Sequence, residues 1–117
     1  MASGKRTNKS YKNLIGGRWI PARTHQTFEN RNPANTNDVV GVFPASGAKD
    51  VADAVAAAKT AFQSWRLVPA PKRAEILFRA GELLLERKER YAHDMTREMG
   101  KVLLETRGDV QEAIDTA

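Results

Sequence analysis

Cysteine is absent from this 117-residue chain. Its absence excludes disulfide bonds, thiolate metal sites and, within these residues, a cysteine nucleophile. Long apolar runs are also lacking: the longest uncharged stretch in the first half, residues 39–48, contains glycine and proline. It falls far short of the roughly 20 apolar residues that span a bilayer. No apolar segment of the kind a secretory signal needs follows Met1. We therefore expect a cytoplasmic chain with no membrane partner.

Several motifs that carry chemistry are missing as well. Gly16-Gly17 is the only glycine pair and no helix signal follows it, so a phosphate-binding loop is not expected. The two histidines, His25 and His93, are far apart and lack a metal-binding spacing. Carboxylates of the second half alternate with basic residues, which is typical of a solvated helix face. We predict no catalytic residue and no cofactor-binding residue in this chain.

Positive charge is concentrated at the front of the chain. The formal net charge is +5, yet residues 1–31 hold seven basic residues and one acidic residue, whereas the remainder holds 12 basic and 13 acidic residues. Four of the seven basic residues lie in residues 1–12, which show no apolar periodicity. We interpret residues 1–12 as a disordered basic tail. The tail lacks the aromatic residues that stack on single-stranded nucleic acid, so no nucleic-acid partner is expected.

Turn signals and apolar periodicity divide the rest of the chain into two regions. Residues 13–45 predict short strands at 14–15, 18–20, 27–31 and 39–43, and Gly16-Gly17 tolerates the positive φ angles of a tight hairpin between the first two. Residues 46–117 predict about four helices, because apolar residues recur there at helical spacing. The predicted fold class is α+β, with short antiparallel strands followed by helices.

Each expected helix has a start or stop signal and an apolar stripe. Ser46 is the expected N-cap of the first helix, with Asp50 near the positive end of the helix dipole. Pro71 suits the first turn of the second helix, and Gly100 suits the end of the third, at about 89–99. The fourth begins near Val102. The stripes consist of Val51, Ala54, Val55, Ala58, Phe62 and Trp65; Ile76, Leu77, Ala80, Leu83 and Leu84; Ala92, Met95 and Met99; and Leu103, Val110, Ala113, Ile114 and Ala117.

The fourth helical pattern is still running at Ala117. Natural helices usually end with glycine, asparagine or a basic last turn, and Asp115-Thr116-Ala117 supplies none of these. We therefore expect that the chain is truncated within a helix and that its main partner is the remainder of a longer parent chain.

Six local strings, in order, resemble the amino-terminal part of the aldehyde dehydrogenase superfamily, and the resemblance extends over residues 13–117 without a large gap. They are LIGGRW at 14–19, Phe28 followed by NPA at 32–34, SGAKDV at 46–51 opening an alanine-rich helix, PKRAEIL at 71–77, EMGK at 98–101 and RGDV at 107–110. The resemblance implies that regions 13–45 and 46–117 are peripheral parts of the cofactor-binding domain of a longer α/β protein.

The same resemblance implies an activity for the parent protein. Enzymes of this family oxidise an aldehyde to an acid or acyl-thioester with NAD or NADP, through a cysteine thiolate and a glutamate that activates water. Those residues lie downstream of the region that this chain resembles. The expected function is therefore that of a non-catalytic amino-terminal segment, inactive alone and without bound cofactor. The parent is expected to act on a small aldehyde as a homo-oligomer.

One site implied by the resemblance falls inside this chain. Many family members hold a structural Na⁺ or K⁺ ion through backbone carbonyls just before the NP turn and a downstream aspartate. The matching positions are Asn30, Arg31 and Asp109, whose oxygens are suitable hard ligands. An aspartate that only supports a helix is the alternative.

Two other classes of function stay open at this stage. A free-standing helical interaction module would use its apolar stripes to bind a partner, and a nucleic-acid binder would use the basic tail. The near-neutral balance after residue 31 disfavours the second of these.

Overall fold

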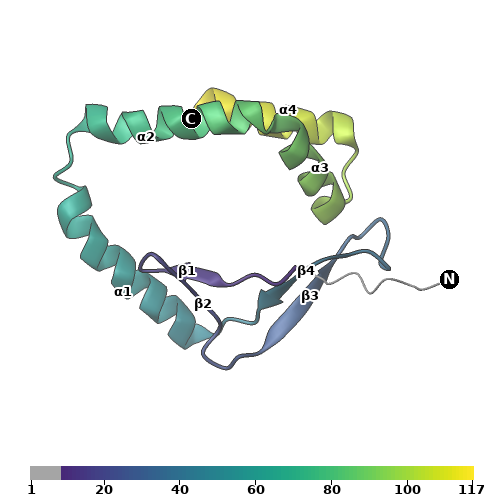
Figure 1. Cartoon of the computed structure of the whole chain (residues 1–117), viewed down its shortest axis with the longest axis horizontal. Coiled ribbons are helices and arrows are strands. Elements are labelled where there is room, and N and C mark those ends of the chain that lie inside the picture. The colour runs from purple at the N-terminus through teal and green to yellow at the C-terminus, as the bar shows by residue number, and fades with distance from the viewer. Residues whose placement is uncertain (1–8) are drawn as a thin grey trace. The chain divides into compact units, whose positions relative to one another are not determined.

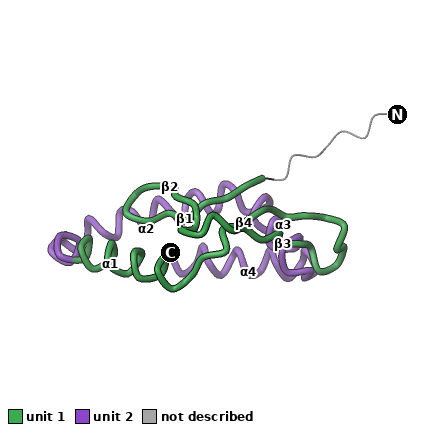
Figure 2. Tube along the Cα trace, turned by 90° about the horizontal axis from the view of Figure 1, so that it is seen from below, with its two compact units in different colours: residues 1–62 green, residues 63–117 purple. Residues whose placement is uncertain are grey.

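The computed structural model describes residues 9–117, and the first eight residues lie outside this description. The elements are β1 (Asn13–Ile15), β2 (Arg18–Ile20), β3 (Thr27–Arg31), β4 (Val39–Pro44), α1 (Ala48–Trp65), α2 (Ala70–Glu86), α3 (Lys88–Met99) and α4 (Leu103–Thr116) (Figure 1). The predicted order of short antiparallel strands followed by helices is confirmed. The chain divides into two compact units, residues 1–62 and residues 63–117 (Figure 2).

The first antiparallel pair, β1 and β2, is a tight hairpin. Leu14 lies opposite Trp19, and Ile15 lies opposite Arg18. Gly16 and Gly17, which connect the strands, have φ angles of 58° and 75°. Two successive positive φ angles match the twist of a two-residue hairpin, and glycine adopts them at the least steric cost. The hairpin predicted at the glycine pair is therefore confirmed.

The second pair, β3 and β4, carries a third segment on the far edge of β4. The Tyr11 amide donates to the Val42 carbonyl at 2.9 Å, and the Val42 amide donates to the Lys9 carbonyl at 2.9 Å. The Tyr11 ring stacks on Phe43 with centroids 4.5 Å apart. A Cβ atom at Gly41 would lie 2.6 Å from this tyrosine ring, so glycine permits the close approach.

This contact corrects the predicted boundary of the disordered tail. Lys9, Ser10 and Tyr11, which the sequence placed in the tail, lie beside β4, and Ser10 forms a parallel bridge with Val42. Backbone pairing and one aromatic stack supply the ordering that local apolar periodicity does not show. The rest of the predicted tail lies outside the described residues.

The start of α1 is held by Asp50. Its two carboxylate oxygens accept hydrogen bonds from the Gly47 amide at 2.8 Å and from the Arg23 amide at 2.9 Å. These two N–H donors, that of Gly47 first, hold the pKa of the Asp50 carboxyl below its usual value. Ser46, the predicted N-cap, instead accepts a hydrogen bond from the Asn13 side chain at 2.8 Å. Asp50 therefore does the capping by reaching back from the first turn.

Asp50→Asn is expected to accelerate amide hydrogen exchange at Gly47 and Arg23 by about tenfold, because a neutral amide accepts these hydrogen bonds more weakly. The pKa is lowered on folding, so the stabilisation is present above the unfolded value near 3.9 and is lost as the pH falls through the folded value. In the unsubstituted chain, protection of both amides should therefore fall in acid. Asp53→Asn is the matched control, since Asp53 pairs with the Arg23 side chain and not with these amides. Equal effects of the two substitutions would contradict the assignment.

The second unit contains α2, α3 and α4, which are joined by short connections. Arg87 alone separates α2 from α3, with φ −107° and ψ 14°. Gly100 ends α3 in the left-handed conformation at φ 74°, as its position in the sequence predicted. The last helix, α4, packs on both α2 and α3 (Figure 1). A Cβ atom at Gly81 would lie 3.4 Å from the Cβ of Ala117, so α2 and α4 approach closely at this glycine.

Most of the predicted apolar stripes are not buried within the described residues. The buried hydrophobic side chains there are Ala22, Ala92 and Val110, whereas Phe62 and Ile76, both on the predicted apolar stripes, are 56% and 57% exposed. The periodicity correctly indicates an apolar helix face, but residues 9–117 do not supply what covers it. No helix among these residues has the length and apolarity needed to cross a membrane.

Candidate functional site

The first two residues of the predicted cation site, Asn30 and Arg31, lie at the end of β3. Asn30 is opposite Gly41 and Arg31 is opposite Val39, so the register skips Val40 at this point. Such an irregularity disturbs the regular ladder and can redirect backbone groups. The Arg31 guanidinium donates to the Thr36 carbonyl at 2.8 Å and also pairs with Glu29. Its positive charge is therefore engaged by neighbouring oxygens.

The third predicted ligand, Asp109, lies in α4, where its carboxylate forms an ion pair with a lysine side chain. Its Oδ2 atom accepts a hydrogen bond from the Lys101 ammonium at 2.6 Å, and both side chains are about one-third exposed. The Asp109 carboxylate raises the pKa of Lys101 above its usual value. Any inorganic cation at Asp109 would have to share this carboxylate with Lys101.

Asn30 and Arg31 belong to the first compact unit and Asp109 belongs to the second. The three-residue cation site therefore stays a prediction. Among residues 9–117, the structure contains no group of three or more histidine, cysteine, aspartate or glutamate side chains placed to hold a metal ion.

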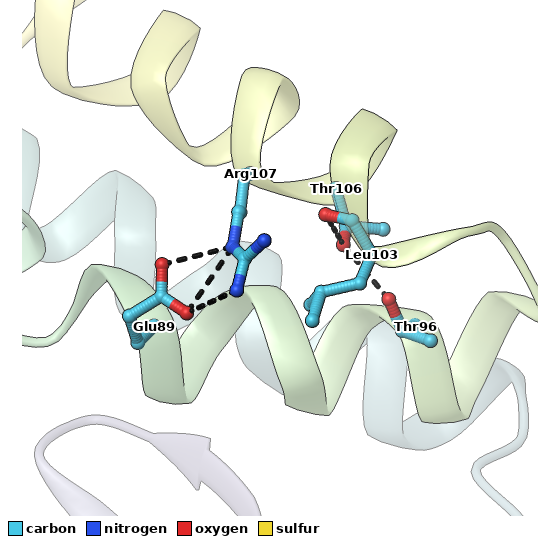
Figure 3. Close-up of polar contacts among 5 residues, drawn as sticks. All are labelled: Glu89, Thr96, Leu103, Thr106 and Arg107. Carbon is cyan, nitrogen blue, oxygen red and sulfur yellow. Dashed lines mark hydrogen bonds and ion pairs between the residues drawn. The ribbon is translucent and has the colours of Figure 1, made fainter.

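The most extensive polar contacts of the second unit join α3 to α4. The Arg107 guanidinium donates to both oxygens of Glu89 at 2.9 to 3.2 Å (Figure 3). This bidentate contact holds the pKa of the Glu89 carboxyl below its usual value. At the start of α3, the Lys88 ammonium donates to the Gln111 side chain, one turn after Arg107 in α4, at 2.7 Å. Together these contacts fix where α4 lies along α3.

A buried hydroxyl lies at the centre of this junction. Thr106 is 0% exposed, and its Oγ1 donates to the Leu103 carbonyl at 3.1 Å. The Thr106 and Thr96 hydroxyl oxygens are 2.8 Å apart (Figure 3). We term Thr96, Thr106 and the Leu103 carbonyl the threonine contact. It satisfies the polar groups that the packing of α3 on α4 removes from water.

Sequence reasoning missed Thr106 and Lys101. Thr106 falls on the stripe that contains Leu103 and Val110, at spacings of three and four residues, so its burial could have been found from the helical period. Lys101 lies between two helices, eight residues from Asp109, and no regular spacing indicates that pair. The polar groups between α3 and α4 bind one another. They are therefore suited to holding these two helices in position.

A shallow pocket of about 220 Å³ lies between the β1–β2 hairpin and the start of α1. It is lined by Asn13, Leu14, Ile15, Ser46, Asp50, Val51 and Ala54. Its polar side chains are already occupied: Asn13 binds Ser46, and both Asp50 oxygens accept backbone amides. The pocket therefore offers chiefly apolar surface, and its carboxylate serves the local fold.

Comparison with known proteins identifies the class of protein that has this fold. The sequence model described as "Aldehyde dehydrogenase family" matches residues 19–117. The chain belongs to the aldehyde dehydrogenase family.

Individual relatives support this assignment in sequence and in structure. The chain is 47% identical over 116 residues to malonate-semialdehyde dehydrogenase of Lacticaseibacillus casei, covering 98% of this chain and 23% of that protein. The NAD-dependent aldehyde dehydrogenase of Sinorhizobium meliloti superimposes with a TM-score of 0.86 at 31% identity, covering 94% and 22% of the two chains. The NADP-dependent glyceraldehyde-3-phosphate dehydrogenase of Bacillus halodurans C-125, solved with NADP, gives a TM-score of 0.85 at 29% identity, covering 91% and 22%.

The chain thus spans between a fifth and a quarter of the length of these relatives. The sequence resemblance to the aldehyde dehydrogenase superfamily is confirmed by the family match and by these relatives.

Proposed function

We propose that this chain forms the non-catalytic amino-terminal segment of an NAD(P)-dependent aldehyde dehydrogenase. The observation that carries the proposal is the family match over residues 19–117 in a chain that contains no cysteine. Because the reaction of this family needs a thiolate nucleophile, the reacting groups would come from residues outside this chain. The proposal assigns no cofactor contact and no catalytic residue to residues 9–117.

The role of the chain in that reaction would be structural. The bidentate Arg107–Glu89 contact and the threonine contact hold α3 and α4 in a fixed relation. Fixed helices position neighbouring parts of a fold, and small displacements of catalytic groups carry large losses in rate. The cofactor, when bound elsewhere in the protein, would accept the hydride that leaves the aldehyde.

The finer properties of the complete protein belong to the same proposal. Use of either NAD or NADP is supported by relatives that are described as NAD-dependent and as NADP complexes. A small aldehyde substrate is supported by the family membership. The homo-oligomeric state, which the family resemblance implies, and the cytoplasmic location, which was expected from the sequence, stay predictions.

A segment exchange tests the proposed function. In malonate-semialdehyde dehydrogenase of Lacticaseibacillus casei, the segment that matches this chain would be replaced by residues 2–117. The chimera is expected to oxidise malonate semialdehyde with a kcat within about tenfold of the unmodified enzyme, because this segment would supply support without reacting groups. The 117-residue chain alone is expected to give no turnover.

The matched control is the same enzyme with the segment deleted, which should be inactive. A chimera as inactive as the deletion variant would contradict the proposal. Turnover by the purified chain alone, persisting through repeated purification, would also contradict it.

A further inference from the structure

A pocket of about 380 Å³ lies where the segment before β1 meets β2. It is lined by Lys9, Ser10, Tyr11, Lys12 and Trp19, which we call the lysine–tryptophan pocket. Small-molecule sites in proteins begin at about 300 Å³, so the pocket has room for a compact ligand. All five residues belong to the first compact unit.

Contacts with β4 hold one wall of this pocket in place. The Lys9 carbonyl accepts the Val42 amide, and the Tyr11 amide donates to the Val42 carbonyl, both at 2.9 Å. The Tyr11 ring stacks on Phe43 with centroids 4.5 Å apart. The Lys9 ammonium lies over the Tyr11 ring, 4.9 Å from its centroid, where the ring attracts a cation. The position of the Lys9 charge is therefore supported by the strand beneath it.

The charge of the lysine–tryptophan pocket is positive. Lys9 and Lys12 line it, and residues 1–28 contain no aspartate or glutamate. Neither lysine forms an ion pair with another residue in the range 9–117. Two ammonium groups that line one pocket without carboxylate partners attract an anion.

An exposed aromatic ring forms the other wall. Trp19 is 65% exposed, and its backbone is fixed in the hairpin, where it lies opposite Leu14. A tryptophan ring in this position offers a broad apolar surface on which another flat ring can stack. The pocket therefore combines two positive charges with an aromatic surface.

We propose that the lysine–tryptophan pocket binds a small aromatic phosphate. The ammonium groups of Lys9 and Lys12 bind the phosphate oxygens, because lysine binds phosphate as a compact point charge. The indole ring of Trp19 stacks on the aromatic ring of the ligand. This inference goes beyond the proposed function and does not depend on it.

Two simpler ligands use only part of the pocket. A free inorganic anion would engage the lysines and leave Trp19 in water. A neutral aromatic molecule would stack on Trp19 and leave both ammonium groups without a partner. A ligand that carries both groups uses all of these side chains, so its affinity is expected to exceed that of either simpler ligand.

Phenyl phosphate is the probe, and inorganic phosphate is compared with it. At about pH 7.5 a phosphate ester is mostly doubly charged. Binding would be followed by broadening of the ³¹P resonance of each probe, both in the 117-residue chain and in the chimera. Phenyl phosphate is expected to bind with a Kd of about 1 mM, and inorganic phosphate at least about fivefold more weakly.

Single substitutions assign this binding to the pocket. Lys12→Gln should weaken binding of both probes by about fivefold, because it removes one of the two charges. Lys59→Gln is the matched control, since Lys59 is an exposed lysine of α1 that does not line the pocket. It should change neither affinity by more than about twofold. Trp19→Leu should weaken phenyl phosphate by about fivefold and leave inorganic phosphate within about twofold.

Each outcome decides one part of the proposal. Lack of phenyl phosphate binding in both the chain and the chimera overturns the site, and so do equal effects of Lys12→Gln and Lys59→Gln. Equal affinity for the two probes, or an unchanged affinity of Trp19→Leu for phenyl phosphate, overturns the aromatic ligand. Oxidation of malonate semialdehyde by the chimera is scored separately, so an inactive chimera that binds the probe contradicts the proposed function and leaves this site standing.

Discussion

The purified 117-residue chain should self-associate, or form a loosely packed state that binds hydrophobic dyes, with helical circular dichroism and no sharp thermal transition. The physical reason is exposed apolar surface. Fifteen large hydrophobic side chains are exposed, up to 79% at Leu104, while Ala22, Ala92 and Val110 are the buried hydrophobic residues among those described. A few short strands and three small buried side chains give little driving force for a cooperative fold. Sedimentation and a thermal melt would measure both properties.

The same two measurements on the active chimera are the control, because there the apolar faces would be covered. The alternative function, a free-standing helical interaction module, requires the opposite behaviour of the isolated chain. A monomer that melts sharply would favour the interaction module and would count heavily against the proposed segment of an aldehyde dehydrogenase.

Thr106→Val is expected to loosen the junction between α3 and α4 strongly. Valine has nearly the shape of threonine, but it removes the hydroxyl that binds the Leu103 carbonyl and the Thr96 hydroxyl. Leaving a buried polar group without its partner costs about 1–3 kcal/mol. In the chimera, protection of amides in residues 103–110 against hydrogen exchange should therefore fall by about 5- to 150-fold.

Thr106→Ser is the matched control, since serine keeps the hydroxyl and loses a methyl group. It should retain more protection than Thr106→Val if the threonine contact governs the junction. The reverse order, with serine more damaging than valine, would show that filling of the buried site matters more than the hydrogen bonds.

Elements with a local cause were predictable from the sequence. Gly16 and Gly17 indicate a hairpin because glycine readily adopts the positive φ angles that the turn requires, and Gly100 ends α3 for the same reason. The helices follow from apolar residues at helical spacing. The fold class and the family resemblance depend on such signals, and both are confirmed.

Features that join distant residues were not predictable in this way. The pairing of Tyr11 with Val42 links segments 31 residues apart, and no local sequence pattern near Tyr11 indicates this partner. The apolar stripe that contains Ile76 shows which face avoids water, but a periodicity does not say what covers it.

The candidate cation site shows a further limit of sequence reasoning. Family resemblance selected Asn30, Arg31 and Asp109 by position, without information on their neighbours. Lys101, the partner of Asp109, lies at a helix junction, and Thr36, a partner of Arg31, lies in a turn, neither at a regular spacing. Glu29, by contrast, lies two residues before Arg31 in the same strand. The polar junction between α3 and α4 was missed for the same reason.

The single residue between α2 and α3 has a mechanical consequence. Because Arg87 alone connects the two helices, the bend between them depends on very few backbone torsions. Helix α4 packs against both helices and therefore acts as a brace across a hinge. The contact between Gly81 and Ala117 is part of this packing, so a change in the last turn of α4 would weaken the support of α2. The order of the last turn of α4 and the direction of α2 are therefore coupled through this packing.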